Sequence, residues 1–284
     1  MSFPPDPALD RPIVETPRPL SSPPAAPVGP AAIELAGLRK RFGDKVAVDD
    51  LWLTVPAGSF FGLVGPNGAG KTTTLRMLTG LLRPDTGLVR VAGVDVWPDP
   101  TMAKVRLGLV PDGLTVFERL TGAEMLVYAG LLRGLGEDEA RARSTTLLEA
   151  LGLSDDADEL IVDYSHGMRK KVVLASALIH RPDVLVLDEP FEGIDPVSSA
   201  AIRDVLHRYR DHGGTVLFSS HVMEVVERLC DRVAIIAHGR ILAAGPLGAL
   251  PTGRHLEEVF LHVVGGGPAH AGDLSWLGRE GRRS

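Results

Sequence analysis

The chain has 284 residues and a mass of 30.2 kDa, which corresponds to one large domain or two small ones. Hydrophobic residues make up 44%, enough for a sizeable core, and the net charge of −6 disfavours a protein that binds nucleic acid mainly through phosphates. The single cysteine, Cys230, excludes an intrachain disulfide framework and a zinc site built from a cysteine cluster. No apolar run approaches the ~18 residues of a membrane span, and the N-terminus lacks a secretory signal pattern. We therefore expect a soluble intracellular protein.

Biased composition marks the two ends of the chain. Residues 1–30 contain 10 of the 22 prolines, and each proline removes a backbone donor and fixes φ. We expect 1–30 to be a disordered proline-rich tail. Residues 265–284 begin with three glycines, and we expect a flexible C-terminal tail there, with Trp276 as its one anchoring feature. The folded domain is then expected at 31–264.

Strands and helices alternate along this folded part. Short strand-like segments at 33–35, 46–48 and 51–55 precede an apolar strand at 60–64, a glycine-rich turn, and a helix in which Leu75, Leu78 and Leu82 recur at helical spacing. Further strands are predicted at 88–91, 107–110, 184–187, 215–219, 233–237 and 241–244, and helices at 125–132, 137–151, 166–179, 195–213 and 221–230. The alternation predicts an α/β fold with helices on a mostly parallel sheet.

Local signals support several of these boundaries. Thr121 and Glu124 form a capping-box pattern, and Asp195 followed by Pro196 is typical of a helix start. The continuous apolar run at 184–187 indicates a strand that is buried on both faces, as in a parallel sheet.

A phosphate-binding pattern follows the strand at 60–64. Residues 65–72 read Gly-Pro-Asn-Gly-Ala-Gly-Lys-Thr and match G-x-x-x-x-G-K-[ST] in full. Glycines let backbone N–H groups turn toward an anion, and the helix N-terminus adds positive potential. Lys71 is expected on the β- and γ-phosphates, and Thr72 on Mg²⁺.

An acidic pair follows the buried strand at 184–187. Asp188 stands where a carboxylate at the strand end faces the phosphate loop, which predicts a Mg²⁺ partner. Glu189 comes next and is predicted to orient or deprotonate the attacking water.

The order of motifs resembles the nucleotide-binding domain of ATP-binding-cassette (ABC) transporters. After the phosphate loop come a Thr-Gly-Leu-Leu-Arg-Pro-Asp-Thr-Gly segment at 79–87, Tyr-Ser-His-Gly-Met at 164–168, an acidic segment at 188–196 and Ser-Ser-His at 219–221. The resemblance covers about 31–264. It implies a P-loop NTPase core of mostly parallel sheet flanked by helices, with an antiparallel β subdomain and a helical signature subdomain at about 112–180.

The resemblance also implies roles for individual residues. Phe42 takes the place of the aromatic that stacks on adenine, Asp195 that of a carboxylate at a dimer interface, and His221 that of a γ-phosphate sensor. Ser165 and Gly167 lie in the signature segment, which caps the ATP of the opposite subunit in this family. The implied nucleotide-binding set is Phe42, Gly65, Pro66, Asn67, Gly68, Ala69, Gly70, Lys71, Thr72, Thr73, Ser165 and Gly167; the catalytic set is Glu189, His221 and Asp112; the metal set is Thr72, Asp188 and Asp112.

Two departures from the family pattern stand out. Asp112 occupies a position where the family usually has Gln, sometimes Glu, so direct Mg²⁺ ligation is in question, although a water can bridge the gap. In the signature, Tyr164, His166 and Met168 replace three of the five common residues. An imidazole at His166 near phosphate is unusual chemistry, and an outward-pointing side chain is an equal alternative.

The leading functional hypothesis is an ATP-binding and ATP-hydrolysing subunit that energises a separate membrane permease, of exporter or multidrug-resistance type. ATP and Mg²⁺ are the expected cofactors. The expected partners are the permease and a second nucleotide-binding subunit, as a homo- or heterodimer, with no nucleic acid; the expected location is cytoplasmic, at the inner membrane face. The alternatives are a soluble non-transport ABC ATPase, and a nucleotide-binding regulatory module with impaired hydrolysis.

Overall fold

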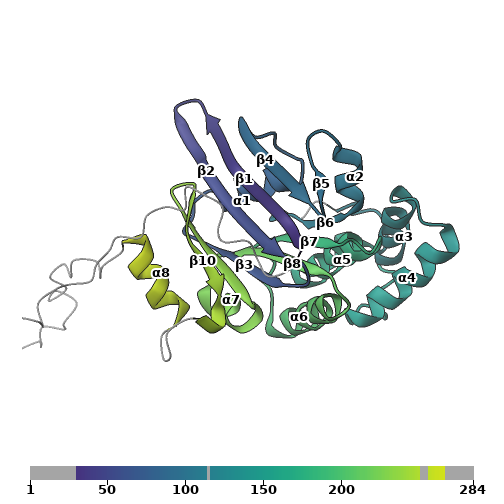
Figure 1. Cartoon of the computed structure of the whole chain (residues 1–284). Coiled ribbons are helices and arrows are strands. Elements are labelled where there is room, and N and C mark those ends of the chain that lie inside the picture. The colour runs from purple at the N-terminus through teal and green to yellow at the C-terminus, as the bar shows by residue number, and fades with distance from the viewer. Residues whose placement is uncertain (1–29, 114–115, 250–254, 266–284) are drawn as a thin grey trace, which may run out of the picture.

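A computed structural model describes residues 30–113, 116–249 and 255–265. Their strands form two sheets, one antiparallel with four strands and one mostly parallel with six. Figure 1 shows the two sheets packed on each other, with α3 and α4 at one end of the molecule and α8 at the other. Both expected tails, apart from residues 30 and 265, lie outside the described residues.

The antiparallel sheet has the order β2-β1-β4-β5. Its strands are β1 (Ala31–Phe42), β2 (Lys45–Pro56), β4 (Thr86–Val91) and β5 (Val94–Asp95). The three short segments predicted before residue 56 belong to β1 and β2, two strands of 12 residues each whose pairing contains several register shifts. These irregularities interrupt the alternation of apolar residues, and this is why the sequence pattern showed only short pieces.

The six-stranded sheet contains the parallel core. Its order is β10 (Arg240–Pro246), β9 (Arg232–Ala237), β3 (Phe60–Val64), β8 (Thr215–Ser220), β7 (Val184–Asp188) and β6 (Leu107–Val110). Every neighbouring pair is parallel except β9 and β10. The carboxyl ends of β3, β7 and β8 therefore meet at one edge, which brings the predicted phosphate loop, acidic pair and histidine together.

The described ranges contain eight α-helices, of which all but the last lie between strands. They are α1 (Lys71–Leu78), α2 (Pro100–Val105), α3 (Gly122–Leu132), α4 (Glu137–Ala150), α5 (His166–Leu178), α6 (Pro196–Asp211), α7 (Met223–Leu229) and α8 (Leu256–Val264), with 3₁₀ turns at Ile161–Asp163 and Leu247–Ala249. None of the helices that the structure describes is long and apolar enough to cross a bilayer.

The helix after the phosphate loop is shorter than predicted. It ends at Leu78, and Gly80 adopts a left-handed φ of 71°, a conformation that ends helices readily. Leu82 therefore lies beyond the helix, where it packs against the core from a turn. The elements β5, α2 and α8 have no counterpart in the sequence prediction, and the helix predicted at 221–230 begins at Met223.

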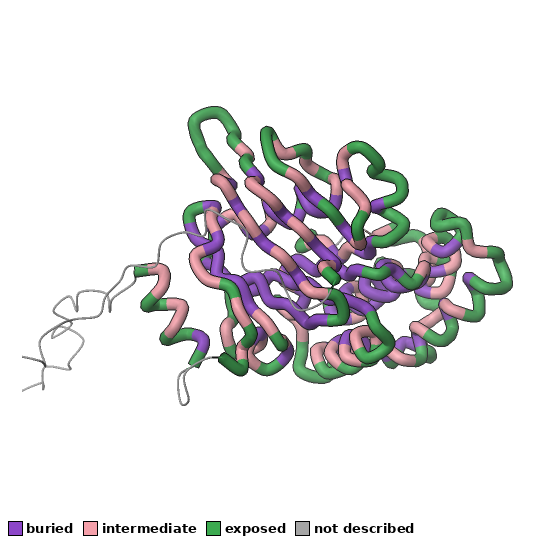
Figure 2. The backbone as a smooth tube through the Cα atoms, in the orientation of Figure 1, coloured by how far each residue is buried: buried purple, intermediate pink, exposed green. Residues whose placement is uncertain are grey.

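Strand β3 separates two hydrophobic cores. All five of its residues are buried, and alternate side chains point to opposite faces. Phe60 and Val64 enter the core beneath α5, α6 and α7, whereas Phe61 and Leu63 enter the core shared with β1, β2 and α1. In Figure 2, buried residues run through both sheets, and exposed residues lie on the outer surfaces of α3 and α4.

A buried tyrosine joins the start of α3 to the segment before α5. The predicted capping box is present, because Thr121 and Glu124 each bond the other's backbone N–H. Tyr164, 4% exposed, donates from its hydroxyl to the Asp156 carbonyl at 2.6 Å. A Cβ at Gly122 would lie 2.2 Å from that hydroxyl oxygen. Tyr164, where the resembled family commonly has leucine, is thus accommodated by glycine at 122.

Candidate active site

The phosphate loop closes around its own backbone at the N-terminus of α1. Gly70 has a φ of 108°, and a Cβ there would lie 2.6 Å from the Ala47 carbonyl oxygen of β2. Only glycine suits that conformation and that approach. No side chain caps α1, so its first N–H groups stay available for an anion.

A cavity of about 380 Å³ lies over this loop. Its walls come from β2, the phosphate loop, α1 and the ends of β7 and β8, segments far apart in the sequence. The lining residues are Lys45, Ala47, Pro66, Asn67, Gly68, Gly70, Lys71, Thr72, Thr73, Asp112, Glu189, Glu192 and His221. The structure therefore brings most of the predicted nucleotide-binding and catalytic residues together around one cavity.

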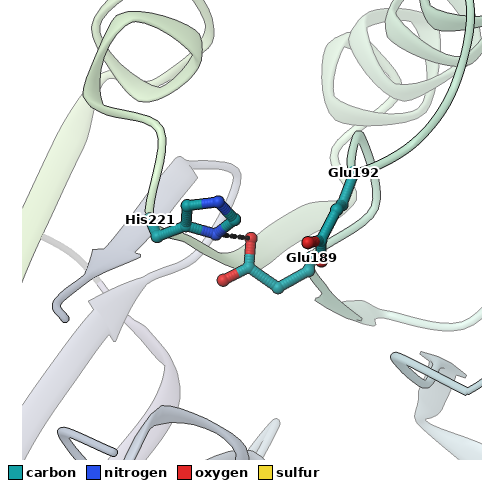
Figure 3. Close-up of side chains that lie close together, drawn as sticks. All are labelled: Glu189, Glu192 and His221. Carbon is teal, nitrogen blue, oxygen red and sulfur yellow. Dashed lines mark ion pairs between the residues drawn. The ribbon is translucent and has the colours of Figure 1, made fainter. Parts of the chain in front are cut away.

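Glu189 lies at the centre of the charged groups in this cavity. Its carboxylate is 3.4 Å from the Lys71 Nζ and 3.1 Å from the His221 Nδ1. Figure 3 shows the imidazole reaching the Glu189 carboxylate from the loop after β8, with Glu192 on the other side of Glu189. The Glu189 backbone has a φ of 49°, a left-handed conformation that non-glycine residues adopt mainly at turns and functional sites.

Lys71 is buried and has two partners. Its ammonium donates to the Gly65 carbonyl at 2.7 Å and pairs with Glu189. An incoming phosphate group competes for this cation, because anionic oxygens are stronger acceptors than a carbonyl. The arrangement places a buried cation and a carboxylate in contact at the point where phosphates would bind.

Oxygen ligands suitable for Mg²⁺ gather at one side of the cavity. Thr72 and Asp112 line it, and Asp112 also lines an adjoining cavity of about 80 Å³ whose wall includes Asp188. Hydroxyl and carboxylate oxygens are the donors that Mg²⁺ prefers, so the predicted metal set fits the ion. Glu189, Glu192 and His221 also have ligand atoms within 4.8 Å of one another.

Several predicted residues lie outside the cavity lining. Phe42 is 50% exposed at the end of β1, where Lys40 sits over its ring at 5.7 Å, and it pairs in register with Lys45. Gly65 and Ala69 support the loop from beneath: Gly65 accepts from Lys71, and Ala69 accepts from Gly239.

The signature segment forms the N-terminus of α5, outside the cavity lining. Ser165 is the N-cap, and its hydroxyl accepts from Met168 N at 3.2 Å. Gly167 packs against α6, since a Cβ there would lie 2.7 Å from the Ser198 hydroxyl. Asp195 caps α6 by accepting from Val197 N and Ser198 N. The Ser198 hydroxyl, followed by the backbone N–H groups of Ser198 and Val197, lowers the pKa of the Asp195 carboxyl.

His166 is exposed beside Gly193 rather than buried. Because the family resemblance places the phosphate near His166 on a second subunit, exposure in a single chain agrees with both alternatives left open by the sequence. The same side chain lies on the surface that the family resemblance assigns to the second subunit.

Several residues at this site have no clear signal in the sequence. Lys45, Ala47 and Glu192 line the cavity. Lys170 of α5, 7% exposed, donates to the carbonyls of Glu189 at 3.1 Å and Glu192 at 2.6 Å. Burial lowers the pKa of its ammonium, and Glu192 is the strongest of the nearby carboxylates that oppose this. Lys170 lies about one turn into α5, at helical spacing from the apolar residues Leu174 and Ala177, and this was the available signal.

Phosphate loop, parallel sheet and acidic pair together define a P-loop nucleoside-triphosphatase. The sequence model of the family "ABC transporter" matches residues 48–192. The daunorubicin/doxorubicin resistance ATP-binding protein DrrA of Streptomyces peucetius is 42% identical over 81% of this chain and 71% of its own length. The Nod factor export ATP-binding protein I of Rhizobium sp. is 39% identical over 84% and 78%.

The fold of this chain is also similar to that of solved ATP-binding-cassette structures. The structure titled as the ATP binding subunit of an ABC transporter is 28% identical, with a TM-score of 0.76 over 82% of this chain and 99% of that one. A post-hydrolysis ATP-binding-cassette dimer bound to ADP and Pi, 22% identical with a TM-score of 0.70 over 76% and 98%, shares the fold. The chain belongs to the ATP-binding subunits of the ABC transporter family.

Membership confirms the main expectations from the sequence. The fold is the expected α/β P-loop core with an antiparallel and a helical subdomain, and the protein is an ATP-binding, ATP-hydrolysing subunit of exporter type that energises a separate permease. The soluble non-transport alternative is not favoured.

Proposed function

We propose that this chain hydrolyses Mg²⁺-bound ATP in the cavity over the phosphate loop, with Glu189 as the general base. The observation that carries the proposal is the position of the Glu189 carboxylate, 3.4 Å from Lys71 and 3.1 Å from His221 at the end of β7. When the γ-phosphate takes over Lys71, the carboxylate loses its cation and becomes available to accept a proton from water. When ATP binds, the ion pair between Lys71 and Glu189 is therefore replaced by a contact between Lys71 and the γ-phosphate.

The remaining cavity residues bind the nucleotide in this proposal. Backbone N–H groups of 65–72 and the Lys71 ammonium surround the phosphates, with Thr73 beside them, and Phe42 reaches the adenine from the end of β1. Thr72 and Asp188 would hold Mg²⁺, with Asp112 acting through a water; the ion would supply positive charge against the charge that develops on the phosphates. His221 links the Glu189 carboxylate to the γ-phosphate.

A second nucleotide-binding subunit completes the site. Ser165 and Gly167 present the N-terminus of α5, and Asp195 presents that of α6, on one surface outside the cavity lining. Two adjacent helix N-termini favour an anion, and in a head-to-tail dimer this surface faces the partner's ATP. The structural neighbour bound to ADP and Pi has the same fold and is a dimer, which supports this arrangement.

The permease is proposed to dock on the helical subdomain near Asp112. Phe117 is 55% exposed and stacks edge-on against Tyr128 at 5.5 Å. Leu131 and Leu132, about one turn after Tyr128 on α3, are also exposed. Exposed apolar patches commonly mark partner sites. Leu114, in the same segment between β6 and α3, lies outside the described residues.

The transported compound is proposed to be a bulky natural product that leaves the cell. Relatives at 38–42% identity are named for resistance to daunorubicin, doxorubicin or linearmycin and for Nod factor export. The permease is expected to select this compound.

Turnover and nucleotide trapping test the catalytic assignment. Glu189→Gln keeps the shape and removes the base, so ATP hydrolysis should fall by about 10²–10⁴-fold, while ATP binding persists and a dimer accumulates in gel filtration with Mg²⁺ and ATP. Lys71→Ala should weaken ATP binding itself. Glu149→Gln, at an exposed carboxylate of α4, is the matched control. Near wild-type turnover in Glu189→Gln would refute the assignment of the base.

Co-purification with the permease tests the docking surface. Phe117→Ala should leave the ATPase rate of the isolated subunit unchanged and reduce recovery of the complex from membranes. Leu261→Ala removes an equally exposed apolar side chain from α8, at the opposite end of the molecule in Figure 1, and should not reduce recovery. Equal recovery of the two variants would contradict docking at Phe117.

A further inference from the structure

Ser219 is a completely buried polar residue beside the acidic pair. It lies near the end of β8, where it pairs in register with Asp188 of β7, and its relative exposure is 0%. It does not line the nucleotide cavity and belongs to none of the predicted site sets. A hydroxyl in this position must find its hydrogen-bond partners inside the protein.

The Ser219 hydroxyl bonds both acidic residues at once. It donates to the Asp188 Oδ1 at 2.5 Å and accepts from the Glu189 backbone N–H at 3.1 Å. A serine hydroxyl has one proton and two lone pairs. Because an ionised carboxylate only accepts, the proton points to Asp188, and a lone pair is left for Glu189. One oxygen atom therefore ties the proposed metal ligand to the backbone of the proposed base.

This bridge holds Glu189 in an unusual backbone conformation. The φ of 49° is disfavoured for a residue with a side chain and persists only where neighbours enforce it. The structure shows two such neighbours: Ser219 bonds the N–H of Glu189, and Lys170 bonds its carbonyl at 3.1 Å. With the backbone held on both sides, the carboxylate projects toward Lys71 and His221.

We propose that Ser219 is a positioning residue for ATP hydrolysis, one that fixes Asp188 and Glu189 in a single relative arrangement. The inference rests on the proposed roles of Asp188 as metal ligand and Glu189 as base. Partners that orient metal ligands from behind typically change metal affinity or activity by about 10–100-fold when removed. The Ser219 hydroxyl therefore contributes to the rate of the chemical step and to Mg²⁺ binding, and does not contribute to binding of the adenine or to the phosphate loop.

Three serine variants test this with the full chain. Ser219→Ala removes one oxygen atom; Ser219→Thr keeps the hydroxyl; Ser220→Ala is the matched control in the same strand, where the hydroxyl accepts from Val222 N at 3.0 Å and contacts neither acidic residue. The measurements are kcat, KM for ATP, the Mg²⁺ concentration at half-maximal activity, and affinity for a fluorescent ATP analogue.

We expect kcat of Ser219→Ala to fall by about 10–100-fold, with a higher Mg²⁺ midpoint and analogue affinity within about threefold of wild type. Ser219→Thr should recover most of the lost turnover, and Ser220→Ala should match wild type. Turnover and Mg²⁺ midpoint of Ser219→Ala equal to those of Ser220→Ala would overturn the proposal, as would a loss confined to analogue binding.

Glu189→Gln, measured in parallel, separates this inference from the proposed function. An inactive Glu189→Gln beside a fully active Ser219→Ala overturns the role of Ser219 alone. An active Glu189→Gln overturns the assignment of the base, and with it the ground for a positioning role.

Discussion

His180 should make the fold sensitive to mild acid. It follows α5, and its Nε2 is 3.2 Å from the Leu107 carbonyl, which requires the proton to sit on Nε2. Its Nδ1 is buried with no hydrogen-bond partner among the described residues. Burial, reinforced by the positive charge of Arg133, lowers the pKa of His180 from 6.5 to about 4. Protonation would place a charge and an unpaired N–H inside the domain.

The sign and size of the effect follow from this difference in pKa. The unfolded chain takes up the proton near pH 6.5 and the folded chain only near pH 4, so stability is complete above pH 6.5 and declines as pH falls toward 4. At about 1.4 kcal/mol per pH unit, the loss at pH 5.0 has an upper bound of about 2 kcal/mol. Partial solvent access to the ring reduces the expected loss to about 1 kcal/mol.

Urea denaturation of the full chain at pH 7.5 and pH 5.0 measures this loss. His180→Gln can place an N–H donor at the position of Nε2 for Leu107 and cannot titrate, so its free energy of unfolding should fall by about 1 kcal/mol less than that of the wild type over this interval. His262→Gln, at an exposed position of α8, gives the general effect of losing an imidazole. Identical pH dependence in wild type and His180→Gln would refute the reasoning from burial.

Three further predictions concern packing, the metal and the tails. Gly122→Ala should destabilise the fold by about 1–3 kcal/mol in thermal or urea unfolding, because its Cβ meets the Tyr164 hydroxyl at 2.2 Å; adding Tyr164→Leu should relieve part of that cost, and strictly additive effects would contradict the contact. Asp112→Asn should lower kcat and spare ATP binding, whereas Asp112→Gln should retain or raise activity; unchanged turnover in Asp112→Asn would remove its proposed role. Deleting 1–29 and 266–284 should leave ATP affinity within a few-fold, because every residue lining the cavity lies between Lys45 and His221; a collapse of affinity in a binding titration would show otherwise.

Local signals in the sequence were sufficient for most elements of the sheet core and for the chemistry of the site. The strand at 107–110 was predicted at the bounds of β6, and the capping box at Thr121 and the N-cap at Asp195 are present as expected. The phosphate loop was recognisable because its glycines, lysine and threonine fall within the eight residues 65–72, and a bound anion requires them in that order. These features depend on interactions within a few residues.

Features that depend on distant segments were not predictable in this way. Lys45 and Ala47 reach the cavity because β2 passes beside the phosphate loop. Pairing between β7 and β8 sets Ser219 against Asp188, and the packing of α5 on the turn after β7 directs Lys170 to Glu189. A buried hydroxyl or ammonium has no characteristic neighbours in the sequence.

The sequence by itself therefore determined that this protein binds and hydrolyses a nucleotide. A contiguous loop at 65–72 and two consecutive acidic residues, Asp188 and Glu189, carry that chemistry. Only the tertiary structure decided which groups hold Glu189 in its left-handed conformation and which close the cavity around it. The physical reason is that the partners of a buried polar group are chosen by strand register and helix packing, which join residues separated by tens of positions in the chain.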